Sequence, residues 1–232
     1  MLLLPTYLGG EDNHNIQHSR LIMTQTVAIS QTISSLNEAD SILNLQRTTE
    51  ADFFLEWSEE LPQLTEQEKQ TLNGLKTRYL YYAADNAIAE GTIKIIIISP
   101  LLELANLCDP PLKIRAEKAV NIELEDREIK LQGFIDALVV QNKFWVIIIE
   151  AKKYGFNVSL ALPQALAYMM ANPNLDKPIF GMVTNGEDYI FIKLNQQTRQ
   201  YDFSKKLTLS DRDNHEFYQV LQVMKRITTL AF

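Results

Sequence analysis

Asp136, Glu150 and Lys152 are the residues of this chain whose types and spacing best suit chemistry. Asp136 lies in the segment GFIDALVV, and Glu150 and Lys152 end the apolar run FWVIIIEAK. Two carboxylates from neighbouring strands offer the hard oxygen ligands that Mg²⁺ or Mn²⁺ requires. A bound divalent ion lowers the pKa of a water and polarises a phosphoryl oxygen, and a lysine two residues after a carboxylate projects from the same strand face. The spacing therefore indicates metal-dependent phosphodiester hydrolysis, with the lysine stabilising developing charge.

The turn between the two strands decides whether both carboxylates reach one face of the sheet. A two-residue loop over 141–142 places Asp136 and Glu150 on opposite faces, because side chains alternate along a strand. A three-residue loop over 141–143 places Asp136 opposite Ile148, with Glu150 one diagonal step away and a Cβ separation of roughly 7 Å. A metal site at these carboxylates therefore predicts an odd-length loop or a β-bulge.

A structural ion pair is the competing interpretation of the same residues. Glu150 follows a Val-Ile-Ile-Ile run, and a charge beside a buried strand is costly unless it is paired or used. A pair of Lys152 with Asp136 or with Glu150 at a sheet edge would satisfy this requirement without chemistry. The sequence leaves both interpretations open.

The first 86 residues are expected to form a tail and a helical region. Residues 1–45 are polar and show no sustained periodic spacing of apolar residues, so they are expected to be a flexible tail or linker. Met23 is an alternative start of the protein. The region 46–86 is predicted to be helical. A short helix carries Phe53, Phe54 and Trp57 and ends before Pro62, and a second helix begins at the capping-box spacing of Thr65 and Glu68 and presents Leu72, Leu75, Tyr79 and Tyr82.

Residues 87–232 are predicted to form an α/β domain, a mixed β-sheet flanked by helices. The stretch AIAEGTIKIIIISPLLELANL favours a helix by its length and a strand by its isoleucines; we predict a helix, kinked near Pro100. Three strands follow Pro110 and Pro111, the third apolar on both faces as in a central strand. A helix begins at Pro163, a hairpin turns at Asn185-Gly186, and a helix covers 213–232.

Charge and composition limit the classes of function. The net charge of −7 is concentrated in residues 1–70, where three basic residues stand against eleven acidic ones, while 71–232 hold 19 basic and 18 acidic residues. The predicted site region is thus near neutral, without the plainly basic face of many DNA-binding domains. The single cysteine, Cys108, excludes cysteine-cluster zinc sites. No run is long and apolar enough for a membrane span, so we expect a cytoplasmic location without membrane contact.

The pattern D-x(13)-E-A-K on adjacent strands resembles the PD-(D/E)xK restriction-endonuclease-like superfamily. With Gln164 and Tyr168 on the following helix, residues 85–195 are similar to the N-terminal nuclease domain of type I restriction enzyme R subunits, and the chain resembles stand-alone cyanobacterial proteins labelled as restriction subunits. The resemblance implies a restriction-endonuclease-like fold, cleavage of DNA, and a partner subunit or homo-oligomer. It also implies a helix-borne acid at Glu90, metal binding by Asp136, Glu150 and the Ala151 carbonyl, and a catalytic Lys152.

Two departures from that pattern affect the expected activity. Ile135 stands where the superfamily name has proline. No G-x(4)-G-K-[ST] phosphate loop occurs in the sequence, and this loop is what cradles nucleotide phosphates in ATP-driven motors. We therefore expect any cleavage by this chain to be independent of a motor or assisted by a partner.

The supporting residues each have a simpler explanation. Gln164 and Tyr168 share a helix face, which also suits a packing tyrosine beside an exposed glutamine. Glu90 could be a first-turn acid favoured by the helix dipole. Lys94 and Lys153 are candidate phosphate contacts, although a solvated lysine is the commoner case.

Three classes of function follow. The leading hypothesis is a Mg²⁺-dependent endodeoxyribonuclease of the restriction type. The second is a catalytically silent nuclease fold that binds nucleic acid or assembles with a partner, which suits the acidic N-terminal third. The third is a small-molecule hydrolase that uses the same carboxylates, which no pocket-forming motif supports.

Overall fold

The computed structural model of the chain describes residues 25–85, 88–124, 129–141 and 144–230. The strands are β1 (Gln25–Ala28), β2 (Gln46–Arg47), β3 (Leu112–Leu124), β4 (Ile129–Gln141), β5 (Phe144–Ala151), β6 (Ile179–Thr184), β7 (Asp188–Asn195), β8 (Gln200–Phe203) and β9 (Leu207–Thr208). The α-helices are α1 (Ile29–Thr32), α2 (Leu36–Leu43), α3 (Glu66–Ala83), α4 (Glu90–Ile93), α5 (Ser99–Leu104), α6 (Leu162–Met170) and α7 (His215–Leu230). A π-helical turn, Lys94–Ile98, joins α4 to α5, and a 3₁₀ helix, Val158–Ala161, precedes α6.

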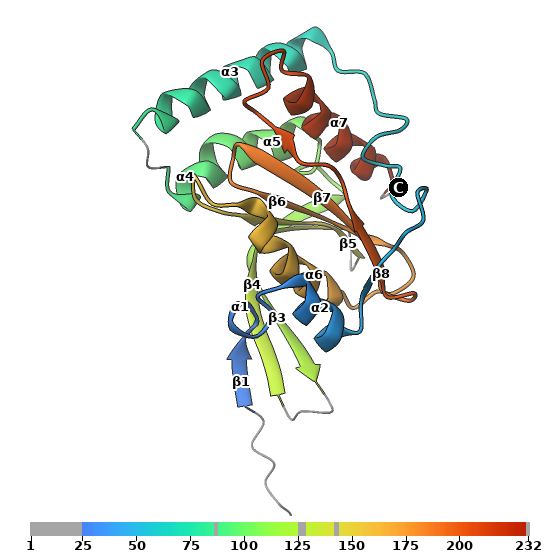
Figure 1. Ribbon diagram of the computed structural model, residues 1–232. Coiled ribbons are helices and arrows are strands. Elements are labelled where there is room, and N and C mark those ends of the chain that lie inside the picture. The colour runs from blue at the N-terminus through green and yellow to red at the C-terminus, as the bar shows by residue number, and fades with distance from the viewer. Residues whose placement is uncertain (1–24, 86–87, 125–128, 142–143, 231–232) are drawn as a thin grey trace, which may run out of the picture.

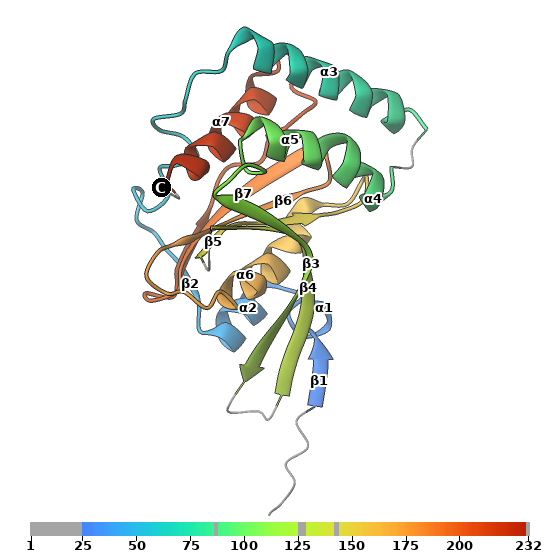
Figure 2. The same cartoon turned by 180° about the vertical axis from the view of Figure 1, so that it is seen from behind.

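These strands form one mixed sheet within the described ranges. Its order is β1-β4-β5-β6-β7-β8-β2, with β3 paired to β4 and β9 to β7. Helices α3, α5 and α7 cover one face, and α2 and α6 cover the other (Figures 1 and 2). The predicted mixed α/β sheet flanked by helices is confirmed. No helix in the described part of the chain has the length and apolar character needed to cross a membrane.

Strand β5 lies inside the sheet, as its two-sided apolar pattern predicts. It pairs antiparallel with β4 and parallel with β6. Separate hydrophobic clusters pack on the two faces of the sheet. One joins Tyr79 of α3, Ile97 of the π-helical turn and Val220 of α7, and the other joins Ile29 of α1 and Leu166 of α6. The carboxylate-bearing strands are therefore held from both sides.

The segment that follows Ile88 is helical, as predicted, and its helix type changes from π to α directly before Pro100. The π-helical turn stands directly before α5, whose first turn contains Pro100. Ile96, Ile97 and Ile98 are all buried although they are consecutive, because the π-helical turn packs against α3 as well as within the cluster on the sheet. The strand propensity of the isoleucines is overridden by this packing. Such turns are frequent at functional sites.

The prediction of a flexible tail is wrong for residues 25–45. Residues 1–24, with the alternative start Met23, lie outside the described residues. β1 pairs in parallel with β4, and Ile29, Ile33 and Ala39 are buried. A capping box of Ser35 and Glu38 opens α2. These elements are four to eight residues long, too short to show a sustained period, and they are stable only because they pack on β4 and α6.

The predicted helix around Phe53, Phe54 and Trp57 is also wrong, because residues 51–60 form turns. A helix this short has little stability of its own, and Phe54 is buried against Phe180 without one, at a ring-centroid distance of 6.1 Å. The next helix, α3, is confirmed with its capping box, and it buries Leu72, Leu75 and Tyr79. Tyr82, predicted on the same face, is exposed. The boundaries 46–86 and 87–232 stay a prediction.

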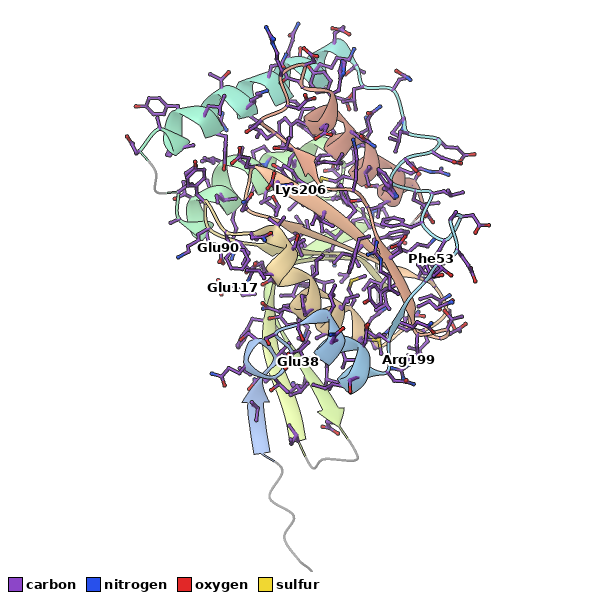
Figure 3. All side chains as sticks on the ribbon, in the orientation of Figure 1. Glu38, Phe53, Glu90, Glu117, Arg199 and Lys206 are labelled. Carbon is purple, nitrogen blue, oxygen red and sulfur yellow. The ribbon has the colours of Figure 1, made fainter. Side chains whose placement is uncertain are left out.

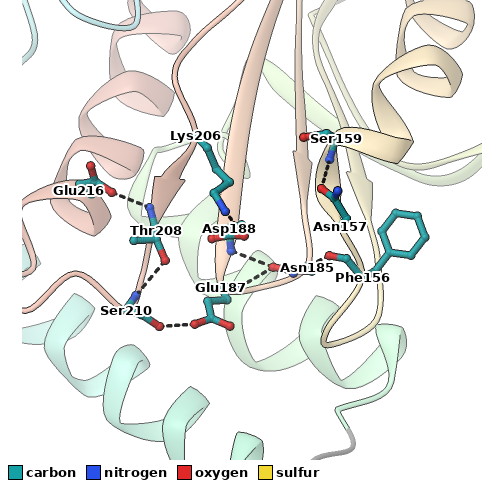
Figure 4. A network of polar contacts seen from close by, with 10 residues as sticks. All are labelled: Phe156, Asn157, Ser159, Asn185, Glu187, Asp188, Lys206, Thr208, Ser210 and Glu216. Atoms are coloured by element: carbon teal, nitrogen blue, oxygen red, sulfur yellow. Dashed lines mark hydrogen bonds and ion pairs between the residues drawn. The ribbon is translucent and has the colours of Figure 1, made fainter. Parts of the chain in front are cut away.

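The predicted hairpin at Asn185-Gly186 is confirmed as β6–β7, with a loop longer than two residues because Thr184 pairs with Tyr189. The Asn185 side-chain oxygen accepts from the backbone N–H groups of Glu187 and Asp188 at 3.0 and 2.8 Å. The Asn185 amide donates to the Phe156 carbonyl at 2.8 Å (Figure 4). This turn therefore also fixes the segment that leaves β5.

Candidate active site

A β-bulge between β4 and β5 sets the register of the predicted site. The pairing shifts by one residue between Val139 and Val140, so β5 carries one extra residue at this point. Beyond the shift Ala137 pairs with Ile149, and the next residues, Asp136 and Glu150, fall side by side. The predicted bulge is confirmed, but the predicted pairing of Asp136 with Ile148 is wrong, because Ile148 pairs with Leu138. Neither proposed loop forms, because Gln141 already pairs with Phe144, and residues 142–143 lie outside the described residues.

A second distortion, on β3, lies across from Asp136. Glu117 (Figure 3) has φ of 49° and stands between two regular pairs of β3 and β4. Ile135 belongs to the cluster under α6, while Ala137 packs against the cluster under α5. The alternation of β4 is therefore interrupted at Asp136, which turns this carboxylate into the cleft described below. Strained backbone of this kind often marks a functional site.

Asp136 is held by two donors. Its Oδ1 accepts from the Lys94 ammonium at 2.7 Å, and its Oδ2 accepts from the backbone N–H of Ala151 at 2.7 Å. Lys94 also contacts Glu90 Oε1 at 2.9 Å. Burial by itself would lower the pKa of Lys94, but its hydrogen bonds to Asp136 and Glu90 outweigh burial and raise that pKa above its usual value. Lys94 is therefore a permanent positive charge between two carboxylates.

Glu150 is the most buried of the acidic residues in this group, with 2% of its surface exposed. Its Oε1 accepts from the Lys152 ammonium at 2.6 Å. Its Oε2 is buried and has no hydrogen-bond partner among the described residues. Burial and the nearby charge of Asp136 raise the pKa of Glu150 to about 7, against the opposing effect of Lys152. The Glu150–Lys152 ion pair of the competing interpretation is thus present, but inside the sheet rather than at its edge.

Gln164 and Tyr168, one turn apart on α6, extend the group. Gln164 accepts from Lys152 Nζ at 3.5 Å and donates to the Tyr168 hydroxyl at 2.5 Å. Tyr168 is buried against β4, where a Cβ on Gly133 would lie 2.6 Å from the Tyr168 ring. Burial raises the pKa of Tyr168 to about 12, so its hydroxyl stays protonated at neutral pH. Gln164 is part-buried in this chain of hydrogen bonds, which the solvated-glutamine alternative does not explain.

A single cleft of about 470 Å³ brings the predicted side chains together. Its lining includes Glu90, Asp136, Glu150, Lys152, Gln164 and Tyr168. The seventh predicted residue, Ala151, contributes its backbone N–H to Asp136; its carbonyl as a metal ligand stays a prediction. Glu90 lies at the start of α4 (Figure 3) and reaches Asp136 only through Lys94.

Several residues of the cleft escaped the sequence analysis. Residues 26–28 and Ser30 form part of the lining, and nothing in that polar stretch pointed to a site. Phe134, 58% exposed, also lines the cleft. One signal was available, because a glycine such as Gly133 within a strand suggests a close approach. Lys94, a candidate phosphate contact from the sequence, instead pairs with Glu90 and Asp136. Lys153, the other phosphate-contact candidate, is exposed.

The carboxylate oxygens in the cleft could supply a small number of ligands to a hard metal ion such as Mg²⁺. Among the described residues there is no group of three or more His, Cys, Asp or Glu side chains placed to hold a metal ion. Mg²⁺ is commonly bound by one or two carboxylates, with water and phosphate completing its shell. Glu150 Oε2, buried without a partner, and the neighbouring Asp136 carboxylate fit that requirement.

One comparison with known proteins, the match to a family model, agrees with the sequence resemblance. Residues 107–207, just under half of the chain, match the family described as Type I restriction enzyme R protein N terminus (HSDR_N). No curated protein matches. Among solved structures, the fragment structure assigned to an HsdR subunit of a type I restriction enzyme from Vibrio vulnificus YJ016 aligns with 16% sequence identity and a TM-score of 0.37. The alignment covers 59% of this chain and 26% of that one.

Proposed function

We propose that the chain is a metal-dependent endonuclease of the restriction type, which hydrolyses phosphodiester bonds in DNA. The observation that carries the proposal is the convergence of two carboxylates, a lysine, a glutamine and a tyrosine on one cleft. The family match over 107–207 supports it, because it includes Asp136, Glu150, Lys152, Gln164 and Tyr168. The match supports a restriction-related nuclease; DNA as substrate and Mg²⁺ or Mn²⁺ as cofactor belong to the proposal.

In this mechanism Asp136 and Glu150 hold the metal and Lys152 serves the reacting groups. A bound Mg²⁺ would polarise a phosphoryl oxygen and lower the pKa of a water. Lys152, anchored by Glu150 at 2.6 Å and by Gln164 at 3.5 Å, directs its remaining hydrogen-bonding capacity to the attacking water or a phosphate oxygen. The water adds its hydroxyl to phosphorus, the bond to one nucleoside oxygen breaks, and that oxygen leaves with a proton.

Tyr168 and Gln164 orient Lys152. The Gln164 amide group is fixed on one side by the Tyr168 hydroxyl, so its carbonyl oxygen faces Lys152. Tyr168 is itself fixed by packing on Gly133. Pre-oriented donors avoid reorganisation during the reaction, which is the main source of electrostatic catalysis.

The test is cleavage of supercoiled plasmid DNA with Mg²⁺ or Mn²⁺ and with EDTA. Lys152→Ala is expected to abolish the metal-dependent cleavage while the circular dichroism spectrum is unchanged. Lys69→Ala is the matched control, because Lys69 also pairs with a glutamate, at 2.7 Å, but on the surface of α3. Cleavage that survives in Lys152→Ala would refute the proposed mechanism.

One observation favours a second candidate, a catalytically silent module that binds nucleic acid or a partner chain. Lys94 already neutralises Asp136 without any metal, so the cluster is a stable ion-pair network as it stands. This candidate predicts that the chain binds neither Mg²⁺ nor Mn²⁺ by calorimetry and that it cleaves no nucleic acid. Metal binding together with metal-dependent cleavage supports the nuclease, and the absence of both supports the silent module.

A further inference from the structure

Lys94 occupies the position between Glu90 and Asp136 that the proposed metal would compete for. Its ammonium is 2.7 Å from Asp136 Oδ1 and 2.9 Å from Glu90 Oε1. The side chain is only 31% exposed. Lys94 begins the π-helical turn, and the two carboxylates that it contacts both line the cleft. A lysine in this place is part of the site and is not a solvated surface charge.

Three of the four carboxylate oxygens of Asp136 and Glu150 already accept a hydrogen bond. Asp136 Oδ1 accepts from Lys94, Asp136 Oδ2 accepts from the Ala151 N–H, and Glu150 Oε1 accepts from Lys152. Glu150 Oε2 alone of these four has no partner among the described residues. Because the N–H of Ala151 belongs to the backbone and Lys152 holds Glu150, Lys94 is the donor whose departure frees an oxygen of Asp136, the neighbour of Glu150 across the two strands.

We infer that Lys94 is a built-in competitor of the divalent ion, and that its displacement from Asp136 sets the metal affinity of the site. This inference rests on the proposed metal-dependent function. Two like charges in one small site repel each other, and at the reduced dielectric of a part-buried site that repulsion is several times stronger than in water. A metal ion therefore binds Asp136 only when the ammonium leaves it.

The charge of Lys94, rather than its size, is the property that matters. The structure places three carboxylates against two ammonium groups, from Glu90, Asp136 and Glu150 against Lys94 and Lys152. Removing the positive charge at Lys94 leaves the negative charges of Glu90 and Asp136 uncompensated. The carboxylates then attract a divalent ion more strongly, and no side-chain cation competes with it for Asp136. An arginine at the same position would keep the competing positive charge.

Isothermal titration calorimetry of Mn²⁺ alone into the full chain tests the inference. Lys94→Met and Lys94→Gln are expected to bind Mn²⁺ at least about tenfold more tightly than the wild type. Lys94→Arg is expected to bind within about threefold of the wild type. Lys69→Met is the matched control and is expected to show wild-type affinity, since Lys69 pairs with Glu66 outside the site.

A thermal readout covers the case in which an uncharged variant is poorly folded. In EDTA, Lys94→Met is expected to melt below the wild type, and saturating Mn²⁺ is expected to raise its Tm more than the wild-type Tm. Unchanged or weaker Mn²⁺ affinity in both folded uncharged variants would overturn the inference, as would the absence of Mn²⁺ binding in every variant. These outcomes are separate from DNA cleavage: tighter binding without cleavage would refute the proposed function and leave the role of Lys94 standing.

Discussion

The β4–β5 and β6–β7 hairpins lie beside each other in the sheet and differ in regularity. Residues 179–184 pair with 189–194 without a shift, and all of β6 is buried. The β4–β5 pairing contains a one-residue shift, and the β3 residue across from Asp136 has a left-handed backbone. Both hairpins carry an aspartate paired with a lysine: Asp136 with Lys94 at 2.7 Å, and Asp188 with Lys206 at 2.9 Å.

The difference shows how an ordinary sheet becomes a site. In the regular hairpin, unbroken alternation fixes the face of the sheet to which each side chain points, and Asp188 stays beside the turn, paired with Lys206. In the irregular hairpin, the bulge brings Asp136 and Glu150 to the same side, and the interruption at Asp136 places its carboxylate in the cleft. Bulges are common beside active sites because they redirect side chains without ending the strand.

The largest effect on cleavage is expected when the aspartate of each hairpin is replaced in turn by asparagine. Asp136→Asn removes one of two metal-binding carboxylates, so we expect metal-dependent cleavage to fall about a thousandfold. Asp188→Asn removes an exposed ion pair worth less than about 1 kcal/mol, and it is expected to leave cleavage unchanged. Plasmid-cleavage rates measure both. Equal rates for the two variants would show that the irregular hairpin has no special role.

The two strand glycines give the next largest contrast, in the free energy of unfolding. A Cβ at Gly133 would meet the Tyr168 ring at 2.6 Å, and a Cβ at Gly181 would meet the sulfur of Met169 at 2.9 Å. The Tyr168 ring is held by Gln164 and cannot yield easily, whereas a methionine side chain adapts. We expect Gly133→Ala to cost about 2–3 kcal/mol and Gly181→Ala about 1 kcal/mol or less in urea unfolding. The reverse order would contradict this account of Tyr168.

The free energy of unfolding should depend on pH through the buried carboxyl group of Glu150. Burial and the charge of Asp136 raise the folded pKa of Glu150 to about 7 from 4.5, so the folded state retains a proton that the unfolded state loses. The stability contributed by the protonated group is complete below about pH 4.5 and is lost as the pH rises through about 7.

In EDTA, the unfolding free energy of the wild type relative to Glu150→Gln should therefore decrease by about 1–3 kcal/mol between pH 5 and pH 8. Urea unfolding at several pH values measures the difference. A constant difference between wild type and Glu150→Gln would contradict the burial of a raised-pKa carboxyl.

The smallest effect concerns the left-handed residue of β3. Glu117 has φ of 49°, which costs a residue with a Cβ more than it costs glycine. We expect Glu117→Gly to be about 0.5–1 kcal/mol more stable than Glu117→Ala, because glycine relieves the strain. At the neighbouring Lys118, where the pairing is regular, glycine is expected to be less stable than alanine. If the alanine variant were more stable than the glycine variant at position 117 as well as at position 118, the left-handed conformation of Glu117 would be contradicted.

Much of the fold was predictable where local signals agree with packing. The capping box of Thr65 and Glu68, the turn at Asn185 and the two-sided apolar run of β5 are each encoded within a few residues, and each is confirmed. The stretch 25–45 and the turns at 51–60 were mispredicted. Their buried residues are stabilised by elements distant in the sequence, such as β4 for β1 and Phe180 for Phe54.

The sequence by itself determined which groups are available for chemistry: a carboxylate within one strand, a carboxylate and a lysine at the end of the next, and a glutamine and a tyrosine one helical turn apart. Only the tertiary structure decided that they share a cleft, since this depends on a one-residue shift between β4 and β5. It also decided that Lys94 lies on Asp136 and that Glu150 keeps a buried oxygen without a partner. Distances between side chains from different elements follow from register and packing, and both arise from contacts over the whole chain.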